Sequence, residues 1–308
     1  MNYSPFVPIG PGDHDRLAPY FKNQSHPLCV YSLPSLLVWS SKIYQPYGAV
    51  VDGEALIVGV EFTPFHESHR HLILPVSPHR TFTPEELARM AVDLGFSRYW
   101  FIPGSYIDGF GRDRVDDLFT VSEQTHLTDY VYRASDLADL KGRKYVKKRN
   151  LVNQFKRSHV MRGRAEEAAI TVDTVPECLD FLEKWCEERD CDASPEEDLA
   201  CEKQAVVNSL THLAVLDMNG LLMRVDGAVS AFGIASGLTP EMGVLHFEKA
   251  FSGIKGLYQY FDSLCARRLF NGYRYINKES DMDLERLARA KASYHPVRMV
   301  PAYGLTLR

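Results

Sequence analysis

The chain has 308 residues, of which 45% are hydrophobic and 24% are charged, and its formal net charge is −5. These values are typical of a soluble globular protein with room for two domains, and they exclude a short accessory module. No apolar run approaches the roughly 18 residues that a membrane span needs. The first residues also lack the basic start and apolar core of a signal peptide, so we expect a cytoplasmic protein.

The first part of the chain predicts a short series of strands and helices. Apolar runs on both sides of Asp52-Gly53 predict a hairpin, and Thr83, Pro84 and Glu86 form the capping pattern of a helix start. The expected elements in order are a helix beginning at 35–39, the hairpin, a strand at 71–76, a helix at 83–94 and a strand at 99–102.

The middle of the chain separates its charges. Between Lys141 and Arg164 there are ten basic residues and no acidic one, whereas between Glu177 and Glu202 there are eleven acidic residues against Lys184 and Arg189. Residues 140–155 carry a modest apolar stripe and predict a helix with one solvent-facing side. Such segregation indicates either a patch for a partner or two segments that neutralise each other.

The last part of the chain repeats the order of the first. After helices predicted at 176–188 and 198–216 come a hairpin at Asp226-Gly227, a strand at 243–248, a helix from Ile254 to Leu269 and a strand at 273–277. The separation from turn glycine to helix-ending glycine is 42 residues in the first copy (53 to 95) and 45 in the second (227 to 272). We infer an internal duplication.

Only the second copy has a glycine-containing loop between its strand and its helix. The residues of this loop are Ser252, Gly253, Ile254, Lys255 and Gly256. A strand feeding such a loop aims unpaired backbone N–H groups at one point, where the helix dipole also favours an anion. The loop is therefore a candidate phosphate site, or else a plain turn. The loop of the first copy, 77–82, has no glycine and carries His79 and Arg80.

Three stretches carry a resemblance to a known family. They are Lys141-Gly-Arg-Lys-Tyr-Val-Lys-Lys-Arg-Asn-Leu-Val-Asn-Gln-Phe155, Phe247-Glu-Lys-Ala250, and Tyr275-Ile-Asn-Lys-Glu-Ser-Asp281 leading to Ala290-Lys-Ala-Ser-Tyr-His-Pro296. With the order of elements, they resemble the bacterial family of phosphatidylglycerol lysyltransferase C-terminal-domain-like proteins, over about residues 30 to 306.

The resemblance implies a tandem GNAT fold of the α/β (α+β) class, as in the Fem peptidyltransferases, with units at 1–140 and 141–308. Each unit would be a mixed sheet flanked by helices. Such proteins move an aminoacyl group from aminoacyl-tRNA, whereas the phosphate loop would also suit acyl-CoA. We expect acyl transfer to an amine or hydroxyl acceptor and no tightly bound cofactor. The alternative is a non-catalytic ligand- or RNA-binding module that retains the fold.

The basic segment contains candidate substrate-binding residues, whereas Ser252 to Gly256 are the candidate donor-binding residues. Lys144, Lys147, Lys148 and Arg149 could contact the phosphates of a tRNA, or could simply form a solvated helix face. Asn150 and Asn153 lie three residues apart, where their amides could contact a ligand or fix the helix to its neighbour.

Two residues are candidates for catalysis by their position in the second copy. Alternation places Glu248 beside the loop, on the same strand face as His246, where GNAT enzymes often have a general base. A salt bridge to Lys249 or a nearby arginine is the competing interpretation. Tyr294 follows the last helix, as does the tyrosine that protonates the leaving group in many GNAT enzymes, although a core tyrosine bonded to backbone fits equally.

The end of the last predicted strand is polar. If the strand extends far enough, Asn277, Glu279 and Asp281 share one side and could hold an amine, with Lys291 as an ionic partner. Asp281 or Asp283 could instead cap the following helix.

No metal site is expected. His66, His69 and His71 lack a carboxylate or fourth ligand nearby in sequence, and Cys186 and Cys191 are poorly spaced for a shared metal. The six cysteines contain no Cys-x-x-Cys pair and are expected to be reduced thiols.

Overall fold

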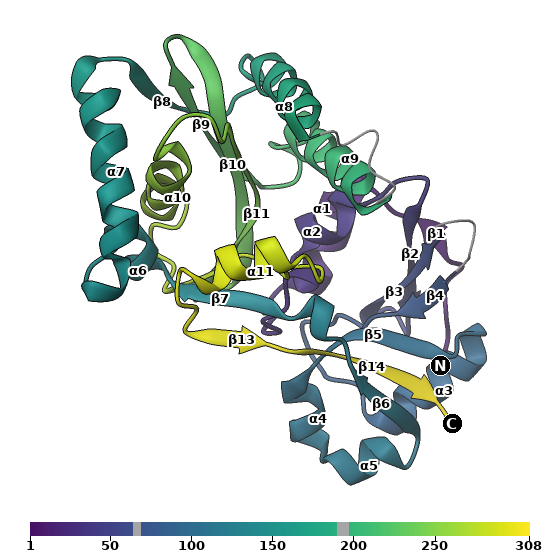
Figure 1. Ribbon diagram of the computed structural model, residues 1–308. Helices are drawn as coiled ribbons and strands as arrows, with labels where there is room; N and C mark the ends of the chain where they lie inside the picture. Colours follow the sequence, from purple (N-terminus) through teal and green to yellow (C-terminus); the bar gives the residue numbers. More distant parts are fainter. Residues whose placement is uncertain (64–68, 190–196) are drawn as a thin grey trace.

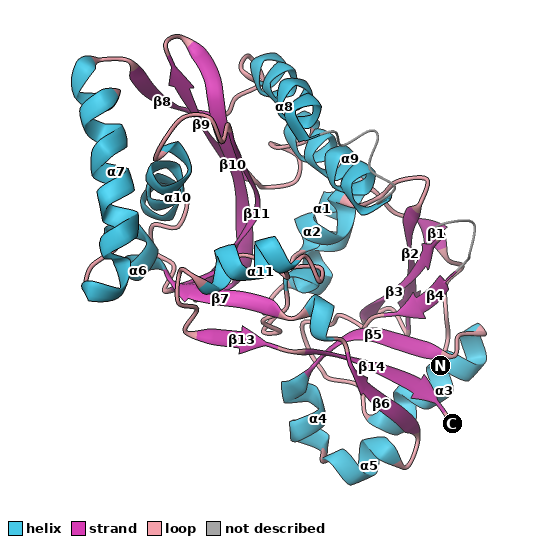
Figure 2. Ribbon diagram, in the orientation of Figure 1, coloured by secondary structure: helices cyan, strands magenta, loops and turns pink. Residues whose placement is uncertain are grey.

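The computed structural model describes residues 1–63, 69–189 and 197–308. Two mixed sheets of seven strands each organise these residues, and helices cover their faces (Figures 1 and 2). The strand order is β1-β2-β3-β4-β5-β14-β6 in the first sheet and β13-β7-β12-β11-β10-β9-β8 in the second.

The strands of the first sheet come from both ends of the chain. They are β1 (Val7–Pro8), β2 (Tyr44–Val51), β3 (Ala55–Phe62), β4 (His69–Leu72), β5 (Arg98–Pro103), β6 (Phe119–Glu123) and β14 (Ala302–Leu307). The strands of the second sheet are β7 (Asp129–Arg133), β8 (Ala165–Ala169), β9 (Asn219–Val225), β10 (Ala228–Thr239), β11 (Met242–Ala250), β12 (Tyr275–Asn277) and β13 (Arg298–Val300).

The two sheets repeat one topology with an exchanged strand. In each sheet an antiparallel series of four strands is followed by one parallel neighbour, β4 with β5 and β11 with β12. The next position is occupied by a strand from the other half of the chain, β14 between β5 and β6, and β7 between β12 and β13. The internal duplication is therefore accompanied by reciprocal strand exchange, and the sheets do not divide at residue 140.

The longer helices lie where the sequence pattern predicts them. Their bounds are α1 (His14–Leu17), α2 (Leu33–Val38), α3 (Pro84–Leu94), α4 (Gly104–Phe110), α5 (Arg112–Asp116), α6 (Ala134–Asp139), α7 (Val146–Ser158), α8 (Val175–Arg189), α9 (Glu197–Thr211), α10 (Leu257–Arg268) and α11 (Glu285–Ala292). Helix α10 begins three residues later than the pattern predicts, because the glycine loop extends to Gly256.

Local sequence signals account for the element ends. The Thr83 side chain accepts a hydrogen bond from the Glu86 N–H, the Glu86 carboxylate accepts one from the Thr83 N–H, and Gly95 ends the helix with φ of 70°. Both Asp-Gly turns have two consecutive positive φ angles, 52° and 75° at Asp52 and Gly53, as a two-residue hairpin turn of type I′ requires. The predicted capping box and hairpins are confirmed.

Two clusters of buried apolar side chains hold the sheets. One runs without a break from the first sheet to the side of the second sheet that α8 and α9 cover, and it includes Tyr99, Phe119, Phe181 and Phe247. The other lies under α6, α7 and α10 and includes Phe155 and Phe261. The second sheet is therefore buried on both faces, which fits the long apolar run of β10.

The exchanged strand β14 gives a test of this topology. Deleting residues 302–308 removes the strand between β5 and β6 together with the fully buried Ala302 and Leu305. We expect hydrogen exchange at residues 98–103 and 119–123 to rise to that of unprotected amides. Deletion of residues 1–8, which removes only the edge strand β1, is the control. Unchanged protection after the first deletion would contradict the exchange.

Candidate functional site

The candidate site begins where two parallel strands of the second sheet separate. β11 pairs with β12 only from Met242 to Val244, yet β11 continues to Ala250. β12 ends at Asn277, and Glu279 adopts a φ of 58°. The later half of β11 is thus unpaired on this side, and residues 245–250 and 278–279 lie on the two sides of a gap between the strands.

The loop between β11 and α10 presents unpaired amides beside this gap. The Phe251 N–H donates to the Ser230 carbonyl, but the N–H groups of residues 252–256 donate to no acceptor within the described chain. These amides precede the N-terminus of α10, a helix of 12 residues. Ser252, Gly253 and Lys255 are exposed. The arrangement suits a phosphate or another anion.

The two loop glycines have different roles. A Cβ on Gly253 would meet nothing within 4 Å, so this glycine leaves open space. Gly256 has a φ of 83°, and a Cβ there would lie 2.3 Å from the Leu151 carbonyl oxygen of α7. Gly256 is therefore required by the packing of α7, and a ligand approaching its Cα from that side would meet the helix.

Three buried charged groups meet in the gap. The Lys278 Nζ lies 2.8 Å from the Glu248 Oε2 and 2.8 Å from the Asp262 Oδ1. The side chains of Glu248 and Asp262 are only 5% and 2% exposed. The Glu248 Oε1 is buried and has no hydrogen-bond partner. One lysine thus serves two carboxylates, and one carboxylate oxygen remains available.

The electrostatics follow from this shared lysine. Burial and the neighbouring Asp262 raise the pKa of Glu248 to about 7, although Lys278 acts to lower it. Burial alone would lower the pKa of Lys278, but the charges of Asp262 and Glu248 raise it well above its usual value. Lys278 therefore stays protonated, while Glu248 can exchange a proton near neutral pH, as a general base must.

Tyr294 adjoins the same cluster. Its hydroxyl is buried and forms no hydrogen bond of good geometry, so the interpretation of a tyrosine bonded to backbone is wrong. Burial and the charge of Asp262 raise its pKa well above the usual value, so the phenol stays protonated. The Lys148 Nζ lies 3.7 Å from the centre of its ring and donates to the Ser293 Oγ at 2.7 Å. Lys148 thus turns inward from the basic helix α7.

His246 and Glu248 do not share a site, contrary to the alternation argument. The register between β10 and β11 shifts between Ile234 and Ala235, which makes His246 the extra residue of a β-bulge. His246 contacts the Ser236 Oγ through Nε2 at 2.7 Å and the Glu279 Oε1 through Nδ1 at 3.0 Å. Ser236 in turn lies 2.9 Å from the Ser32 Oγ of the first unit. This buried network joins the two units.

The polar residues at the end of β12 and just after it are engaged within the protein. The Asn277 amide donates to the Asp129 carboxylate at 2.7 Å and to the Pro27 carbonyl. The Tyr130 hydroxyl donates to Asp281 at 2.5 Å. Because the chain turns at Glu279, these side chains do not continue the alternation of a strand. The helix cap at α11 is Leu284, with no side-chain hydrogen bond, so a cap by Asp281 or Asp283 is also wrong.

Lys291 holds the backbone of this turn. Its ammonium donates to the carbonyls of Lys278 at 2.6 Å, of Glu279 at 3.2 Å, and of Ser280. Burial lowers its pKa. These three carbonyls belong to the segment that carries Lys278, so Lys291 fixes the position of the cluster's lysine.

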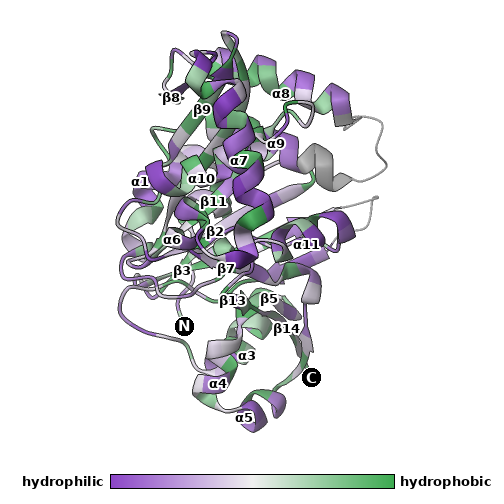
Figure 3. Ribbon diagram, turned by 60° about the vertical axis from the view of Figure 1, so that its left-hand side comes forward, coloured by the Kyte–Doolittle hydropathy of each residue, from purple (hydrophilic) through white to green (hydrophobic). Residues whose placement is uncertain are grey.

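The solvent face of α7 is strongly hydrophilic (Figure 3). Lys147, Asn150 and Asn153 are exposed there, whereas Arg149 donates to the carbonyls of Leu140 and Gly142. Lys144 lies 3.5 Å from Asp136. The packed side of α7 contacts α10 and Gly256, so the helix lies next to the amide loop.

Among the described side chains, the acidic segment does not neutralise the basic one. Where carboxylates of the acidic segment form ion pairs in the described chain, their partners lie outside residues 141–164: Glu177 with Arg224, Asp180 with Lys184, Glu183 with Lys203 and Glu202 with Lys249. The exposed basic side chains of α7 thus remain available to a partner.

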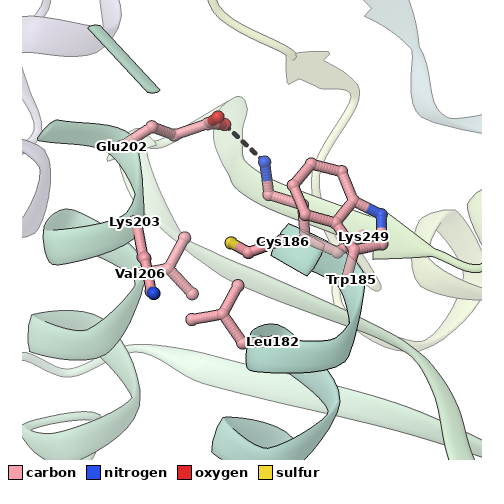
Figure 4. A pocket seen from close by; sticks show the side chains of 7 residues that line it. All are labelled: Leu182, Trp185, Cys186, Glu202, Lys203, Val206 and Lys249. Atoms are coloured by element: carbon pink, nitrogen blue, oxygen red, sulfur yellow. Dashed lines mark hydrogen bonds and ion pairs between the residues drawn. The ribbon is translucent and has the colours of Figure 1, made fainter. Parts of the chain in front are cut away.

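Lys249 points away from the cluster. Its Nζ lies 2.6 Å from Glu202 and 4.3 Å from the centre of the Trp185 ring, in a small hollow of about 10 Å³ between α8, α9 and β11 (Figure 4). The expected alternative of a Glu248–Lys249 pair is therefore wrong, because successive residues of β11 face opposite sides. The hollow itself is too small for a substrate.

The described residues contain no cluster of three His, Cys, Asp or Glu side chains placed to hold a metal. His71 is buried and stacks on Trp100, and His66 and Cys191 lie outside the described residues. Cys29, Cys178, Cys186 and Cys265 form no disulfide. Within the described chain no helix has the length and apolar character to span a membrane.

Two members of the cluster, Asp262 and Lys278, are not indicated by the motifs of the sequence. Asp262 lies among the apolar positions Tyr258, Phe261 and Cys265 of a predicted helix, and a carboxylate on a buried face must find a cation. Lys278 is the only basic residue between Asn277 and Asp283. A search for charged residues at buried positions could have paired them.

The strand order with its parallel pair, its glycine loop and its gap defines a tandem GNAT-like fold. A family model described as "Phosphatidylglycerol lysyltransferase, C-terminal" matches residues 106–306. The chain belongs to this family.

Solved structures agree with the fold. A conserved protein of unknown function from Bacteroides thetaiotaomicron is 28% identical, with 99% of each chain covered and a TM-score of 0.86. The C-terminal domain of a putative lysylphosphatidylglycerol synthetase from Agrobacterium fabrum is 14% identical, covering 83% of this chain and 82% of that one, with a TM-score of 0.56. Among curated proteins, none matches the sequence significantly.

Replacing Lys278 with Met tests the cluster's charge balance. The substitution leaves Glu248 and Asp262 buried without a cation, so we expect a loss of about 3–5 kcal/mol in unfolding free energy at pH 8. Without the cation, the folded carboxyls hold protons more tightly than the unfolded ones. Stability is then lost as pH rises above the unfolded pKa, and the deficit should be smaller at pH 5.

Lys249→Met is the matched control, because its partner Glu202 is 22% exposed and remains solvated. Urea denaturation at both pH values measures the two variants. Equal losses for both, or a Lys278→Met deficit independent of pH, would show that the cluster does not behave as a buried charged unit.

Proposed function

We propose that this protein transfers an acyl group, and specifically an aminoacyl group from aminoacyl-tRNA, to an amine or hydroxyl acceptor. The observation that carries the proposal is the buried cluster of Glu248, Asp262, Lys278 and Tyr294 beside the open amides of residues 252–256. Membership of the lysyltransferase C-terminal family supports the reaction class.

The cluster supplies both proton transfers of such a reaction. Glu248 uses its unpaired Oε1 to take the proton from the acceptor as the acceptor attacks the acyl carbon. The bond from that carbon to the donor oxygen then breaks, and the protonated Tyr294 hydroxyl gives its proton to the leaving oxygen. Lys278 holds the Glu248 carboxylate, and Asp262 balances the lysine. General acid–base assistance of this kind contributes about 10²- to 10⁴-fold to a rate.

The donor binds across the amide loop and α7. The N–H groups of residues 252–256 receive a phosphate, and Lys147 with Asn150 and Asn153 extends the contact along an RNA backbone. Lys148 and Arg149 are not assigned to the RNA contact, because both side chains turn toward the protein. Lys148 packs on the Tyr294 ring, and Arg149 binds the Gly142 carbonyl before α7.

Acyl-CoA is a second candidate donor. The five consecutive free amides favour it, because they suit the pyrophosphate of coenzyme A. The four cysteines of the described chain that form no disulfide are consistent with a cytoplasmic setting for either donor.

Donor binding is tested at Gly253. Gly253→Val adds a side chain in open space, so we expect unchanged stability and donor binding weakened about tenfold or more, which is about 1.4 kcal/mol. Thr81→Val, in the corresponding loop of the first unit, should leave binding unchanged. Thermal shift with coenzyme A and filter binding of bulk tRNA at two salt concentrations identify the donor. Binding of neither would leave a non-catalytic module as the better account.

The pH dependence of transfer tests Glu248. A base must be deprotonated, and the pKa of this carboxyl is raised to about 7. We expect the transfer rate to rise with pH and to level off above about pH 7, and Glu248→Gln to lower the plateau by about 10²-fold or more while donor binding persists. A rate in Glu248→Gln that keeps the same pH profile would assign the base elsewhere.

A further inference from the structure

One aromatic side chain of the second unit is exposed at the start of α10. Tyr258 is 36% exposed, whereas every other phenylalanine, tyrosine and tryptophan of the described chain is buried or half-buried. The residue belongs to the first turn of α10, two positions after the end of the amide loop. A single exposed ring does not by itself indicate a ligand, so its surroundings decide what it does.

The hydroxyl of Tyr258 ties its ring to the strand that carries Glu248. It donates to the Glu248 carbonyl oxygen at 2.8 Å. Glu248 belongs to the part of β11 that has no partner in β12. Because Glu248 precedes the loop and Tyr258 follows it, the side chain links the two ends of the loop. The hydrogen bond fixes the ring, so little conformational freedom is lost when a ligand packs on it.

Helix geometry places the same residue beside the charged cluster. Tyr258 and Asp262 are four residues apart in α10, so they lie on one face of the helix in successive turns. Asp262 faces the cluster, because its Oδ1 lies 2.8 Å from the Lys278 Nζ. Tyr258 is in the turn nearer the loop, so along α10 it lies between the open amides and the cluster.

Polar groups before and after this turn have no partner in the protein. The N–H groups of residues 252–256 donate to no acceptor within the described chain. The Glu248 Oε1, in a side chain that is only 5% exposed, also has no hydrogen-bond partner. Buried polar atoms normally have partners, so the free carboxylate oxygen is an independent sign of a ligand. A ligand that satisfies both sets of groups passes the turn that carries Tyr258.

The two candidate donors differ in where they carry an aromatic group. In aminoacyl-tRNA the reactive ester is on the ribose of the terminal adenosine, so a nucleobase lies close to the acyl carbon. In acyl-CoA the pantetheine arm and the pyrophosphate separate the thioester from the adenine. Tyr258 is hydrogen-bonded to the backbone of Glu248 itself, so a nucleobase on its ring lies near the proposed general base. The position of the ring therefore fits a nucleoside ester.

We propose that Tyr258 determines donor specificity by stacking on the terminal nucleobase of an aminoacyl-tRNA. The inference rests on the proposed transfer from aminoacyl-tRNA, and it names the contact that favours a nucleoside ester over acyl-CoA. Stacking uses the face of the ring, as aromatic side chains do with unpaired bases, while the hydroxyl keeps its bond to the Glu248 carbonyl. The contact lies outside the reacting atoms, so it acts on donor binding and not on the proton transfers.

NMR titrations with AMP and with ribose 5-phosphate test the contact. Both molecules carry a phosphate for the loop amides, and only AMP carries a nucleobase. We expect the unaltered protein to bind AMP about tenfold more tightly or better. Tyr258→Leu should remove this preference, and Tyr258→Phe should keep it because the ring remains. Tyr47→Leu, at a half-buried tyrosine of β2 in the first sheet, is the matched control and should keep the preference.

The outcomes separate this inference from the proposed transfer. Failure of the unaltered protein to prefer AMP, or an equal loss of both ligands in Tyr258→Leu, overturns the stacking contact even if Glu248→Gln still lowers the transfer rate. Coenzyme A should bind Tyr258→Leu as it binds the unaltered protein, and a loss as large as that of AMP overturns the preference for a nucleoside ester. The comparison of AMP with ribose 5-phosphate on the unaltered protein decides the matter even if a variant fails to fold.

Discussion

The reciprocal exchange of β7 and β14 is the constraint on which the rest of the structure depends. Each sheet is complete only when a strand from the other half of the chain occupies the place beside its parallel pair. In the second sheet that strand also positions the site, because the Tyr130 carbonyl of β7 accepts the Lys278 N–H and the Tyr130 N–H donates to Glu279. The first unit therefore contributes directly to the geometry of the second unit's charged cluster.

The site combines two features, each of which would destabilise the folded protein if it had no partner. Two buried carboxylates need a cation, and Lys278 supplies it while its backbone is held by the ammonium of Lys291. The open amides of the loop need an acceptor, and their position at the start of α10 makes an anion the natural one. The duplication has kept these features in one copy only, since the equivalent loop at 77–82 carries bulky side chains in place of glycine.

Much of the fold could be predicted from the sequence, because its signals are local. The Asp-Gly turns and the Thr83 capping box depend on neighbouring residues alone. The strand exchange could not be predicted this way, because the residues of a strand do not specify which strands it will pair with. The β-bulge at His246 depends on how β11 pairs with β10, and it changes the direction in which the His246 side chain points. Asp281, expected as a helix cap, instead accepts a hydrogen bond from Tyr130. Glu248 was found from its position, but its partners Lys278 and Asp262 required the three-dimensional arrangement.

The central claim is that the donor binds through the backbone of residues 252–256 in the second unit. Hydrogen exchange at single-amide resolution, with and without a non-hydrolysable aminoacyl-nucleotide or coenzyme A, measures this directly. The account predicts slower exchange of these amides on donor binding, with no change at residues 77–82. Protection of residues 77–82, or donor binding that leaves residues 252–256 unprotected, would contradict it.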